Sequence, residues 1–229
     1  MISFFMQYPE YWSDWSARLW QGAQVSAELS LTGFVLAALL GSLLAWAMKS
    51  SSALLKRCAV FFIQAMRAVP LLALLLALYF ALPSLGLTLS GYWAGALGLG
   101  LQGAAYIAEI LRGGLDALHR GQREAAIATG LTPLQAFTAV ILPQAIRGML
   151  PPLLNAYVSI LKDSSLCALI ATDELMLAAK AIASESFLPM HIFLLVGLFY
   201  FVIAFPLSLL SRALEKRFSR GRKTLRGHS

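Results

Sequence analysis

The 229-residue chain is 59% hydrophobic and only 13% charged, whereas a soluble domain averages about 45–50% apolar and about 25% charged residues. This composition excludes an ordinary soluble domain, and the ample apolar surface excludes intrinsic disorder. The formal net charge of +7 is compatible with either a nucleic-acid partner or a membrane surface, so the positions of the charges have to decide between them.

Five apolar stretches predict transmembrane helices, each near the ~20 residues needed to cross a bilayer. The longest charge-free run, Ala68 to Ala108, holds 41 residues. It is too long for one helix, and Pro83, Gly86 and Gly91 divide it into two. The predicted spans are residues 21–48, 58–82, 91–111, 149–172 and 186–211. We therefore expect an all-α integral membrane protein with a single transmembrane domain over residues 1–229.

The Lys and Arg residues lie mostly on one side of these predicted spans. Fourteen of the 18 fall in the loops after the first and third spans or in the tail, and only Arg18 and Lys180 fall on the other side. Because cytoplasmic loops carry the excess of Lys and Arg, the N-terminus is predicted outside and the C-terminus inside, with residues 212–229 as a basic cytoplasmic tail. Topology thus explains the positive charge, and no nucleic-acid-binding motif accompanies it.

The residues before the first span are aromatic. Residues 1–20 lack the basic start and apolar centre of a cleavable signal peptide. Trp12, Trp15 and Leu19 share one helical face, which predicts an interfacial segment at the outer surface of the membrane.

The third predicted span is rich in small residues, which allow helices to approach closely inside a membrane. We favour packing within one subunit, with pairing between subunits as the alternative. The small residues are Gly91, Ala94, Gly95, Gly98, Gly100 and Ala104.

One long hydrophilic connection, residues 113–147, joins the third and fourth spans. Its first half is compatible with a helix, and Gly130 can supply the left-handed cap that ends it. Thr132, Pro133 and Gln135 then match the start of a second helix, as the N-cap, the first-position proline and the capping-box residue. We expect a helix–turn–helix at the inner surface of the membrane.

The first helix of this loop carries Glu124, Ala125 and Ala126. Alanines leave the backbone open to a partner, and the carboxylate offers one charge to an Arg or an N–H group. This favours insertion into a groove of a soluble protein, and the alternative is a surface helix with nothing docked on it. Pro143 is expected to stop or kink the second helix.

Several motifs occur together in one order along the chain. Glu124-Ala125-Ala126 is followed by Gly130 and then by Val140-Ile141-Leu142-Pro143. This pattern resembles the EAA loop of the membrane-spanning subunits of bacterial binding-protein-dependent ATP-binding-cassette importers, which usually have Ile at the position of Val140. Further blocks resemble the polar amino acid permease branch: Ala105–Gly114 with Gly121-Gln122, Leu161–Leu166 and Leu214–Arg217. Arg67-Ala68-Val69-Pro70 departs from the Arg-Gly-Thr-Pro of that branch.

The resemblance implies a permease subunit of an ATP-driven amino acid importer in the bacterial inner membrane, working by alternating access. Its implied partners are two ATPase subunits, a second permease subunit (an identical copy or a related chain) and a periplasmic amino-acid-binding protein. It leaves the particular amino acid open. The implied ATPase-coupling residues are Gly121, Glu124, Ala125, Ala126, Gly130, Leu142 and Pro143.

The chain itself is predicted to be non-catalytic and free of cofactors. It has no G-x-x-x-x-G-K-[ST] motif, so ATP and Mg²⁺ are expected on the partner ATPase. We find no nucleophile with a base, and Cys58 and Cys167 have no metal-binding spacing and are read as small apolar fillers. His119, His191 and His228 are isolated and are read as surface or interface residues.

Ionisable groups inside spans cost about 2.5–3.5 kcal/mol each and are functional candidates by default. In one hypothesis they line a substrate pathway, where a basic group binds the α-carboxylate of an amino acid and an acidic group binds its α-ammonium. In the alternative, Arg67 or Lys162 pairs with Asp163 and fixes helix packing. The candidate pathway residues are Arg67, Tyr106, Glu109, Lys162, Asp163, Ser164 and Ser165.

Two rival functions stay open at this point. A secondary transporter driven by an ion gradient would favour an internal inverted repeat, and five spans show no convincing one. A non-transporting membrane scaffold would account for the spans and the packing glycines, but it leaves the charges inside the spans unexplained.

Overall fold

The structure is a computed structural model that describes residues 2–118 and 120–223. Every element in this part is helical, as expected for an all-α protein. The α-helices are α1 Ile2–Met48, α2 Ala53–Ala68, α3 Leu71–Leu76, α4 Gly91–Asp116, α5 Arg120–Ala128, α6 Pro133–Gln135, α7 Leu142–Asp163, α8 Leu175–Ser186 and α9 Pro189–Lys223. Short π- or 3₁₀-helical segments connect them: η1 Ala77–Ala81, η2 Leu82–Leu85, η3 Ala136–Ile141 and η4 Ser164–Ile170.

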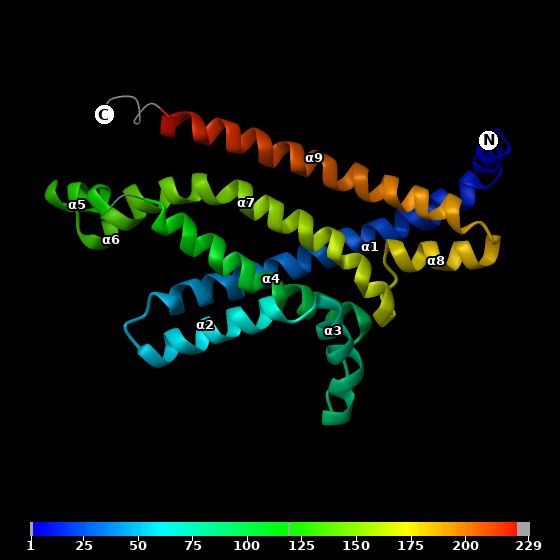
Figure 1. The fold of residues 1–229 in the computed structure, drawn as a ribbon, viewed down its shortest axis with the longest axis horizontal. Helices are drawn as coiled ribbons and strands as arrows, with labels where there is room; N and C mark the ends of the chain where they lie inside the picture. The colour runs from blue at the N-terminus through cyan, green and yellow to red at the C-terminus, as the bar shows by residue number, and fades with distance from the viewer. Residues whose placement is uncertain (1, 119, 224–229) are drawn as a thin grey trace.

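The long helices α1, α4, α7 and α9 run side by side along an elongated bundle (Figure 1). We call the end formed by α5 and α6 the loop end, and the end formed by α8 and the start of α1 the α8 end. The last described residues of α9 lie toward the loop end, as does the turn between α1 and α2. Short helices outside the long spans thus lie at both ends of the bundle: α5 and α6 at the loop end, and α8 at the α8 end.

Four helical stretches in the described residues are long and apolar enough to cross a membrane: Tyr11–Met48, Gly91–Asp116, Pro133–Ile170 and Pro189–Phe218. A fifth span results if the bent pair Ala53–Ala68 and Leu71–Leu85 is counted as one. The predicted number of five is therefore matched only with this pair included.

The prediction of one straight helix over residues 58–82 is wrong. The chain bends by 103° between α2 and α3, because Pro70 has no N–H and the residue before a proline is forced out of the helical region. Val69 accordingly has an extended backbone with φ −82° and ψ 129°.

The N-terminal residues do not form a separate element, because α1 continues without a break from Ile2 to Met48; their position at the outer surface of a membrane stays a prediction. Trp15 and Leu19 are buried, 2% and 0% exposed, in a cluster with side chains of α8 and α9. Trp12 remains exposed, so only part of the predicted aromatic face is available to a membrane surface.

The small residues of α4 pack within this chain, as expected. A Cβ atom on Gly100 would lie 2.9 Å from Cβ of Leu36 on α1, and one on Gly95 would lie 2.9 Å from Sγ of Cys167 on η4. Close approach of α4 to both neighbours therefore depends on the missing side chains. The buried small residues are Gly91, Ala94, Gly95, Gly98, Gly100 and Ala104. Of the two cysteines read as apolar fillers, Cys167 is buried but Cys58 is exposed.

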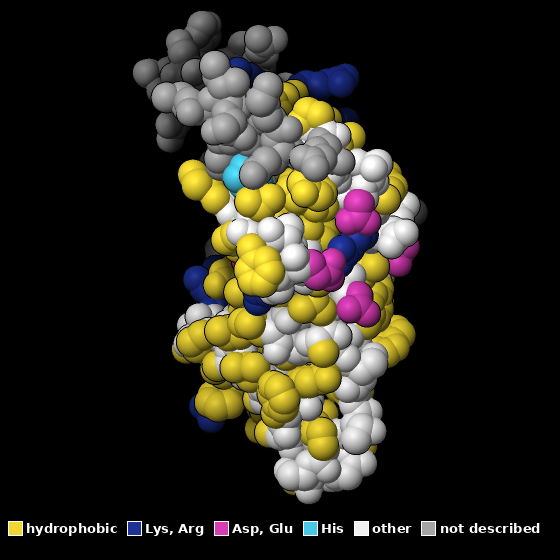
Figure 2. All heavy atoms as spheres, turned by 90° about the vertical axis from the view of Figure 1, so that its right-hand side faces the viewer, with side chains coloured by type: hydrophobic (Ala, Val, Ile, Leu, Met, Phe, Trp, Pro, Cys, Tyr) yellow, Lys and Arg dark blue, Asp and Glu magenta, His cyan; other side chains and the backbone are white. Residues whose placement is uncertain are grey.

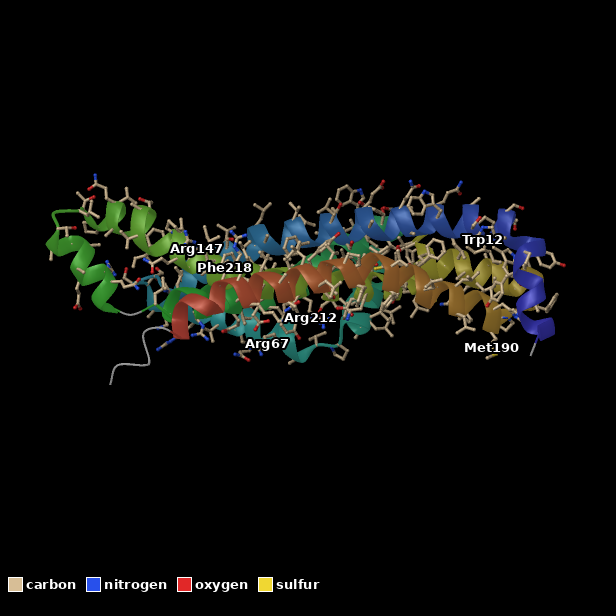
Figure 3. All side chains as sticks on the ribbon, turned by 90° about the horizontal axis from the view of Figure 1, so that it is seen from above. Trp12, Arg67, Arg147, Met190, Arg212 and Phe218 are labelled. Carbon is tan, nitrogen blue, oxygen red and sulfur yellow. The ribbon has the colours of Figure 1, made fainter. Side chains whose placement is uncertain are left out.

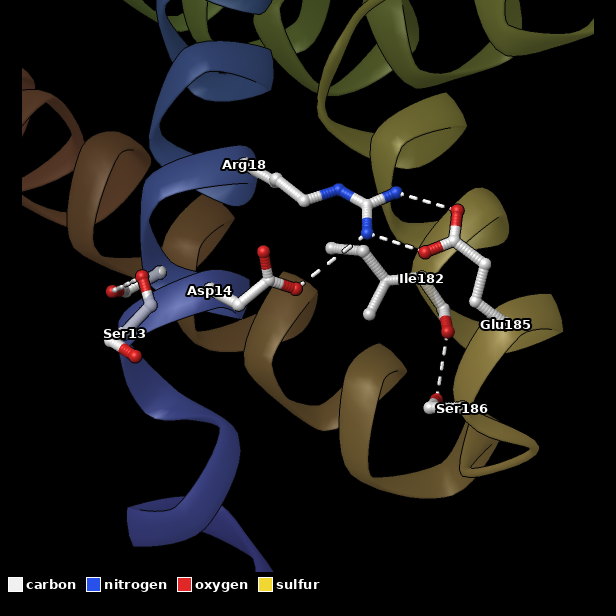
Figure 4. Close-up of polar contacts among 7 residues, drawn as sticks. Ser13, Asp14, Arg18, Ile182, Glu185 and Ser186 are labelled. Carbon is white, nitrogen blue, oxygen red and sulfur yellow. Dashed lines mark hydrogen bonds and ion pairs between the residues drawn. The ribbon is translucent and has the colours of Figure 1, made fainter.

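At the α8 end, α1 and α8 are joined by an ion pair. Arg18 donates two hydrogen bonds to Glu185, of 2.6 and 2.8 Å, and lies 3.7 Å from Asp14 (Figure 4). The guanidinium lowers the pKa of the Glu185 carboxyl. Viewed from this end, acidic side chains gather beside basic ones on a surface that is otherwise largely apolar or uncharged (Figure 2).

Candidate translocation pathway and coupling loop

The break between α2 and α3 leaves backbone carbonyl groups without helical partners. The side-chain amide of Gln102, on α4, donates to the carbonyl oxygen of Val69 at 2.9 Å and lies 3.5 Å from that of Met66. A carbonyl group without a partner is costly in a membrane interior, where water is absent. Gln102 thus stabilises the broken conformation at Pro70.

Arg67 lies in the last turn of α2, directly before this break. Its guanidinium carbon is 5.7 Å from the centre of the Tyr106 ring on α4, a cation–π distance. Both side chains are exposed on the single subunit. Figure 3 places Arg67 well inside the bundle's length, between Arg147 toward the loop end and Trp12 at the α8 end.

The second group of charged candidates lies where α7 gives way to the 3₁₀ segment η4. Lys162 is exposed and Asp163 half-buried at this junction. The hydroxyl of Ser164 donates to the carbonyl oxygen of Leu161 at 2.7 Å, and the hydroxyl of Ser165 donates to the backbone carbonyl oxygen of Lys162 at 2.7 Å. These hydroxyl groups therefore complete the end of α7, and the fully buried Ser164 is not available to a ligand in this conformation.

The alternative of internal charge pairing finds no support in the contacts. Within the described residues, neither Arg67 nor Lys162 lies within ion-pair distance of a carboxylate, Asp163 included. The structure brings Arg67 and Tyr106 together, but it does not bring either of them into contact with the junction at Lys162 and Asp163.

Glu109 borders a cavity of about 280 Å³ between α4 and α7 toward the loop end. Its carboxylate accepts two hydrogen bonds from Arg112, of 2.7 and 3.0 Å. Arg112 also contacts Asp116, which lies 3.3 Å from Lys49 in the turn after α1. Glu109 is thus already paired, and this exposed network ties the ends of α1 and α4 together. The cavity is also lined by Gly113, Gln144, Gly148 and Pro152.

The loop between α4 and α7 contains the two predicted helices. Gly130, with φ +90°, follows α5 in the left-handed conformation that glycine adopts without strain. At the start of α6, Thr132 and Gln135 form a complete capping box, and Pro133 occupies the first turn. These predictions of local structure are confirmed.

Pro143 does not stop the second helix. Helical structure continues from α6 through the π-helical η3 into α7, where Pro143 occupies the first turn. In the π-helical turn before it, hydrogen bonds span five residues, and the N–H of Leu142 donates to the carbonyl oxygen of Phe137. The hydrogen-bond register therefore changes directly before Pro143, which has no N–H. Gln144 donates its side-chain amide to the carbonyl oxygen of Val140 at 2.9 Å.

The tip of this loop exposes apolar side chains beside polar ones. Glu124 is exposed on α5, whereas Ala126 is buried against the second half of the loop. Ile127, Leu134 and Phe137 are exposed, Phe137 at 40% and Leu134 at 71%. Of the other predicted coupling residues, Gly121, Ala125 and Pro143 are exposed and Leu142 is half-buried. An exposed apolar tip at the loop end is typical of an interaction surface.

Sequence reasoning missed two polar groups inside the bundle, the half-buried Gln102 and the buried Glu174. Gln102 lies in the middle of a charge-free run, where a lone amide is itself a signal. Glu174 is fully buried at the start of α8 and accepts hydrogen bonds from Ser26, Leu177 and Tyr200, so that it joins α1, α8 and α9. An acidic residue directly before an apolar run is a helix-start signal, and it would have indicated α8.

Residues 37–220 match the family model described as the binding-protein-dependent transport system inner membrane component. The chain belongs to this family. Within the described residues no group of three or more potential metal ligands occurs.

Curated relatives agree with this assignment. The chain is 38% identical over 159 residues to the probable glutamine ABC transporter permease protein GlnM of Bacillus subtilis, covering 69% of this chain and 74% of the relative. It is 34% identical over 213 residues to the glutamine transport system permease protein GlnP of Escherichia coli K12, covering 89% and 97%.

Solved structures share the fold. A chain of an amino acid ABC transporter crystallised with histidines has a TM-score of 0.84 and 31% identity, covering 90% of this chain and 96% of that one. A chain of an inward-facing methionine ABC transporter has a TM-score of 0.64 at 21% identity and supports the fold alone. The elongated helical bundle is thus the fold of ABC transporter permeases.

Proposed function

We propose that this chain is the membrane-spanning subunit of an ATP-driven amino acid importer, in which a separate subunit hydrolyses ATP. The observation that carries the proposal is the exposed tip of α5 and α6 at one end of a permease bundle. The relatives named above as glutamine permeases support a polar amino acid as substrate. Membership in a binding-protein-dependent transport family speaks against a gradient-driven transporter or a scaffold.

The loop end is proposed to dock the ATPase. Glu124 would meet an Arg or N–H group of the partner, while Ile127 and Phe137 fill an apolar groove, so that closure of the ATPases moves the loop as a lever. Gly130 and the capping box at Thr132 hold the two short helices in a fixed relation, and helical structure that continues into α7 transmits the movement into the spans. This chain contributes force transmission and no chemistry.

The bundle is proposed to lie with its loop end in the cytoplasm of a bacterium and its α8 end outside the inner membrane. The turn between α1 and α2, α5 and the last part of α9 carry many of the basic residues, and these segments lie toward the loop end (Figure 1), which agrees with the cytoplasmic excess of Lys and Arg. A second permease, two ATPases with ATP and Mg²⁺, and an amino-acid-binding protein at the α8 end would complete the importer.

The substrate pathway is proposed to run along the face that exposes Arg67 and Tyr106. The guanidinium of Arg67 has no carboxylate partner among the described residues, so it is free to bind an α-carboxylate. Asp163, half-buried at the junction of α7 and η4, offers the opposite charge for an α-ammonium group. Alternating access would expose these groups first at the α8 end and then at the loop end.

Reversing the charge at Glu124 is expected to release the ATPase. In a Glu124→Arg variant, two like charges would meet in the docked groove, and we expect at least a tenfold loss of co-purifying ATPase because a buried unpaired charge costs several kcal/mol. The measurement is a gentle-detergent pull-down of this chain from its native membrane, with ATP hydrolysis and subunit composition as readouts.

Glu215→Arg is the matched control, because it reverses an exposed glutamate on α9 outside the coupling loop. It is expected to retain the ATPase. If the wild type recovers no ATPase in several detergents, or if both variants retain it equally, the proposed docking at the loop end is wrong.

Removing the guanidinium at Arg67 is expected to abolish uptake and leave assembly intact. Arg67→Ala loses the only charge that stacks on Tyr106 among the described residues, and a lost charged hydrogen bond to substrate costs roughly 1.5–3 kcal/mol, or at least tenfold in rate. Amino acid uptake by cells and ATPase recovery are measured in parallel. Arg67→Lys keeps the charge and is expected to retain part of the uptake, whereas normal uptake by Arg67→Ala would refute the pathway role.

A further inference from the structure

Between Pro151 and Asp163, the exposed positions of α7 are all polar. Asn155, Ser159 and Lys162 are exposed at spacings of four and three residues, so they lie on one face of the helix. The other positions of this stretch are buried or half-buried, and several pack against the core with α1 and α4 or against α9. We call Asn155, Ser159 and Lys162 the polar stripe.

The exposed faces of the neighbouring spans are different. α1 exposes a row of apolar side chains at helical spacing, which suits contact with lipid: Leu31, Val35, Leu39, Leu43 and Trp46. α9 exposes Phe193, Leu194, Leu198, Phe201, Val202, Phe205, Leu209 and Leu210. The polar stripe is therefore not part of a lipid-facing surface, because polar side chains inside a span face a cavity or another protein.

The side chains of Asn155 and Ser159 are also uncommitted. Among the described residues, neither forms a hydrogen bond with another group. Helical serines elsewhere in the chain do turn back to the carbonyl four residues earlier, as Ser42 and Ser208 do at 2.7 and 2.9 Å. The hydroxyl of Ser159 does not, so both its donor and its acceptors are available to a ligand.

The polar stripe leads into the cavity between α4 and α7. Pro152, in the wall of that cavity, lies one helical turn from Asn155, and Glu109, in the opposite wall, lies one turn from Tyr106. By helical spacing, Asn155 on α7 and Tyr106 on α4 therefore lie next to the two cavity walls. The cavity itself is mostly apolar, and Glu109 and Gln144 are its polar side chains. The polar stripe thus runs along α7 from Lys162 to the edge of this cavity.

We infer that the polar stripe lines the substrate pathway, and that Asn155 and Ser159 bind the α-carboxylate and α-ammonium groups of the amino acid on its way from Lys162 to the cavity. This inference rests on the proposed function. An amide and a hydroxyl each donate and accept hydrogen bonds, so each can serve both a carboxylate and an ammonium group. Because they are neutral, they bind weakly enough for the substrate to leave, which conduction requires.

Thiol labelling tests whether the polar stripe faces water. In a Cys58→Ser background of the whole transporter, Asn155→Cys and Ser159→Cys are treated with a charged, water-soluble methanethiosulfonate, beside Leu39→Cys and Leu198→Cys from the apolar faces. Only the thiolate reacts, and it forms readily in water but not in lipid. We expect at least about tenfold faster labelling at 155 and 159, slowed by a mixture of amino acids.

Equal labelling at all four positions would overturn the inference. Shielding of Asn155→Cys and Ser159→Cys both with and without amino acids would also overturn it, because the polar stripe would then belong to a subunit interface.

Uptake of a labelled mixture of the twenty amino acids tests the binding role. Asn155→Leu with Ser159→Ala is expected to lower uptake at least about tenfold, the loss of roughly one hydrogen bond in the rate-limiting step, while ATPase recovery stays at the wild-type level. Asn155→Gln and Ser159→Thr, which keep the polar groups, are expected to retain most of the uptake. Unchanged uptake in the double variant refutes the inference alone, whereas a wild type without uptake or bound ATPase refutes the proposed function.

Discussion

Replacing Gly91 with alanine is expected to destabilise the protein by about 3 kcal/mol, the upper part of the usual cost of overpacking. A methyl group there would overlap the carbonyl oxygen of Ile170 and lie 3.0 Å from that of Ala171. These are backbone atoms, so no side-chain rotation relieves the clash, and the start of α4 must move away from the end of η4. The measurement is the Tm of the purified chain in detergent, which is expected to fall by roughly 5–10 °C.

Gly113→Ala is the matched control on the same helix. A Cβ atom on Gly113 meets nothing within 4 Å, and alanine favours a helix over glycine by about 0.8–1.0 kcal/mol. This variant is expected to keep or raise the Tm. If Gly91→Ala were as stable as Gly113→Ala, the close approach of α4 to η4 would not contribute to stability.

The same contact matters for the candidate pathway, because η4 begins directly after Lys162 and Asp163. Moving α4 away from η4 would shift this junction relative to Tyr106. We therefore expect Gly91→Ala to lower uptake as well, with the ATPase still bound at the distant loop end.

Local signals account for what the sequence predicted correctly. The capping box at Thr132 and Gln135 and the left-handed Gly130 depend on a few neighbouring residues, so they can be inferred without knowing the fold. The same is true of the long apolar runs and of the small residues on α4, whose spacing already indicates a packed face.

Contacts between distant residues account for what was missed. Trp15 and Leu19 have the pattern of a surface anchor, and only the presence of α8 and α9 buries them. The bend at Pro70 is signalled by the proline, but its stability depends on Gln102, 32 positions later in the chain. Similarly, the cation–π contact between Arg67 and Tyr106 needs the observed packing of α2 on α4.

The buried carboxylate of Glu174 is expected to be the other large determinant of stability. Glu174→Ala leaves the hydroxyls of Ser26 and Tyr200 and the N–H of Leu177 without their acceptor. Each buried unsatisfied group costs about 1–3 kcal/mol, so for three groups near the lower value we expect a total loss of roughly 3–5 kcal/mol and a Tm lower by roughly 5–15 °C in detergent. Tyr200→Phe removes one donor and is expected to have a smaller effect.

Glu174→Gln separates hydrogen bonding from charge. Burial raises the pKa of Glu174 above its ordinary value of 4.5, so the unfolded chain loses this proton at lower pH than the folded protein does. Ionisation then favours unfolding, and the stability of the wild type decreases as the pH rises from 4.5 toward the folded-state pKa. Gln stays neutral while it can still accept from Leu177, so the Tm of Glu174→Gln minus that of the wild type is expected to increase with pH over this range. A difference that stays constant with pH would show that burial does not disfavour the charged form of Glu174, and the stabilising role would then be assigned to its hydrogen bonds alone.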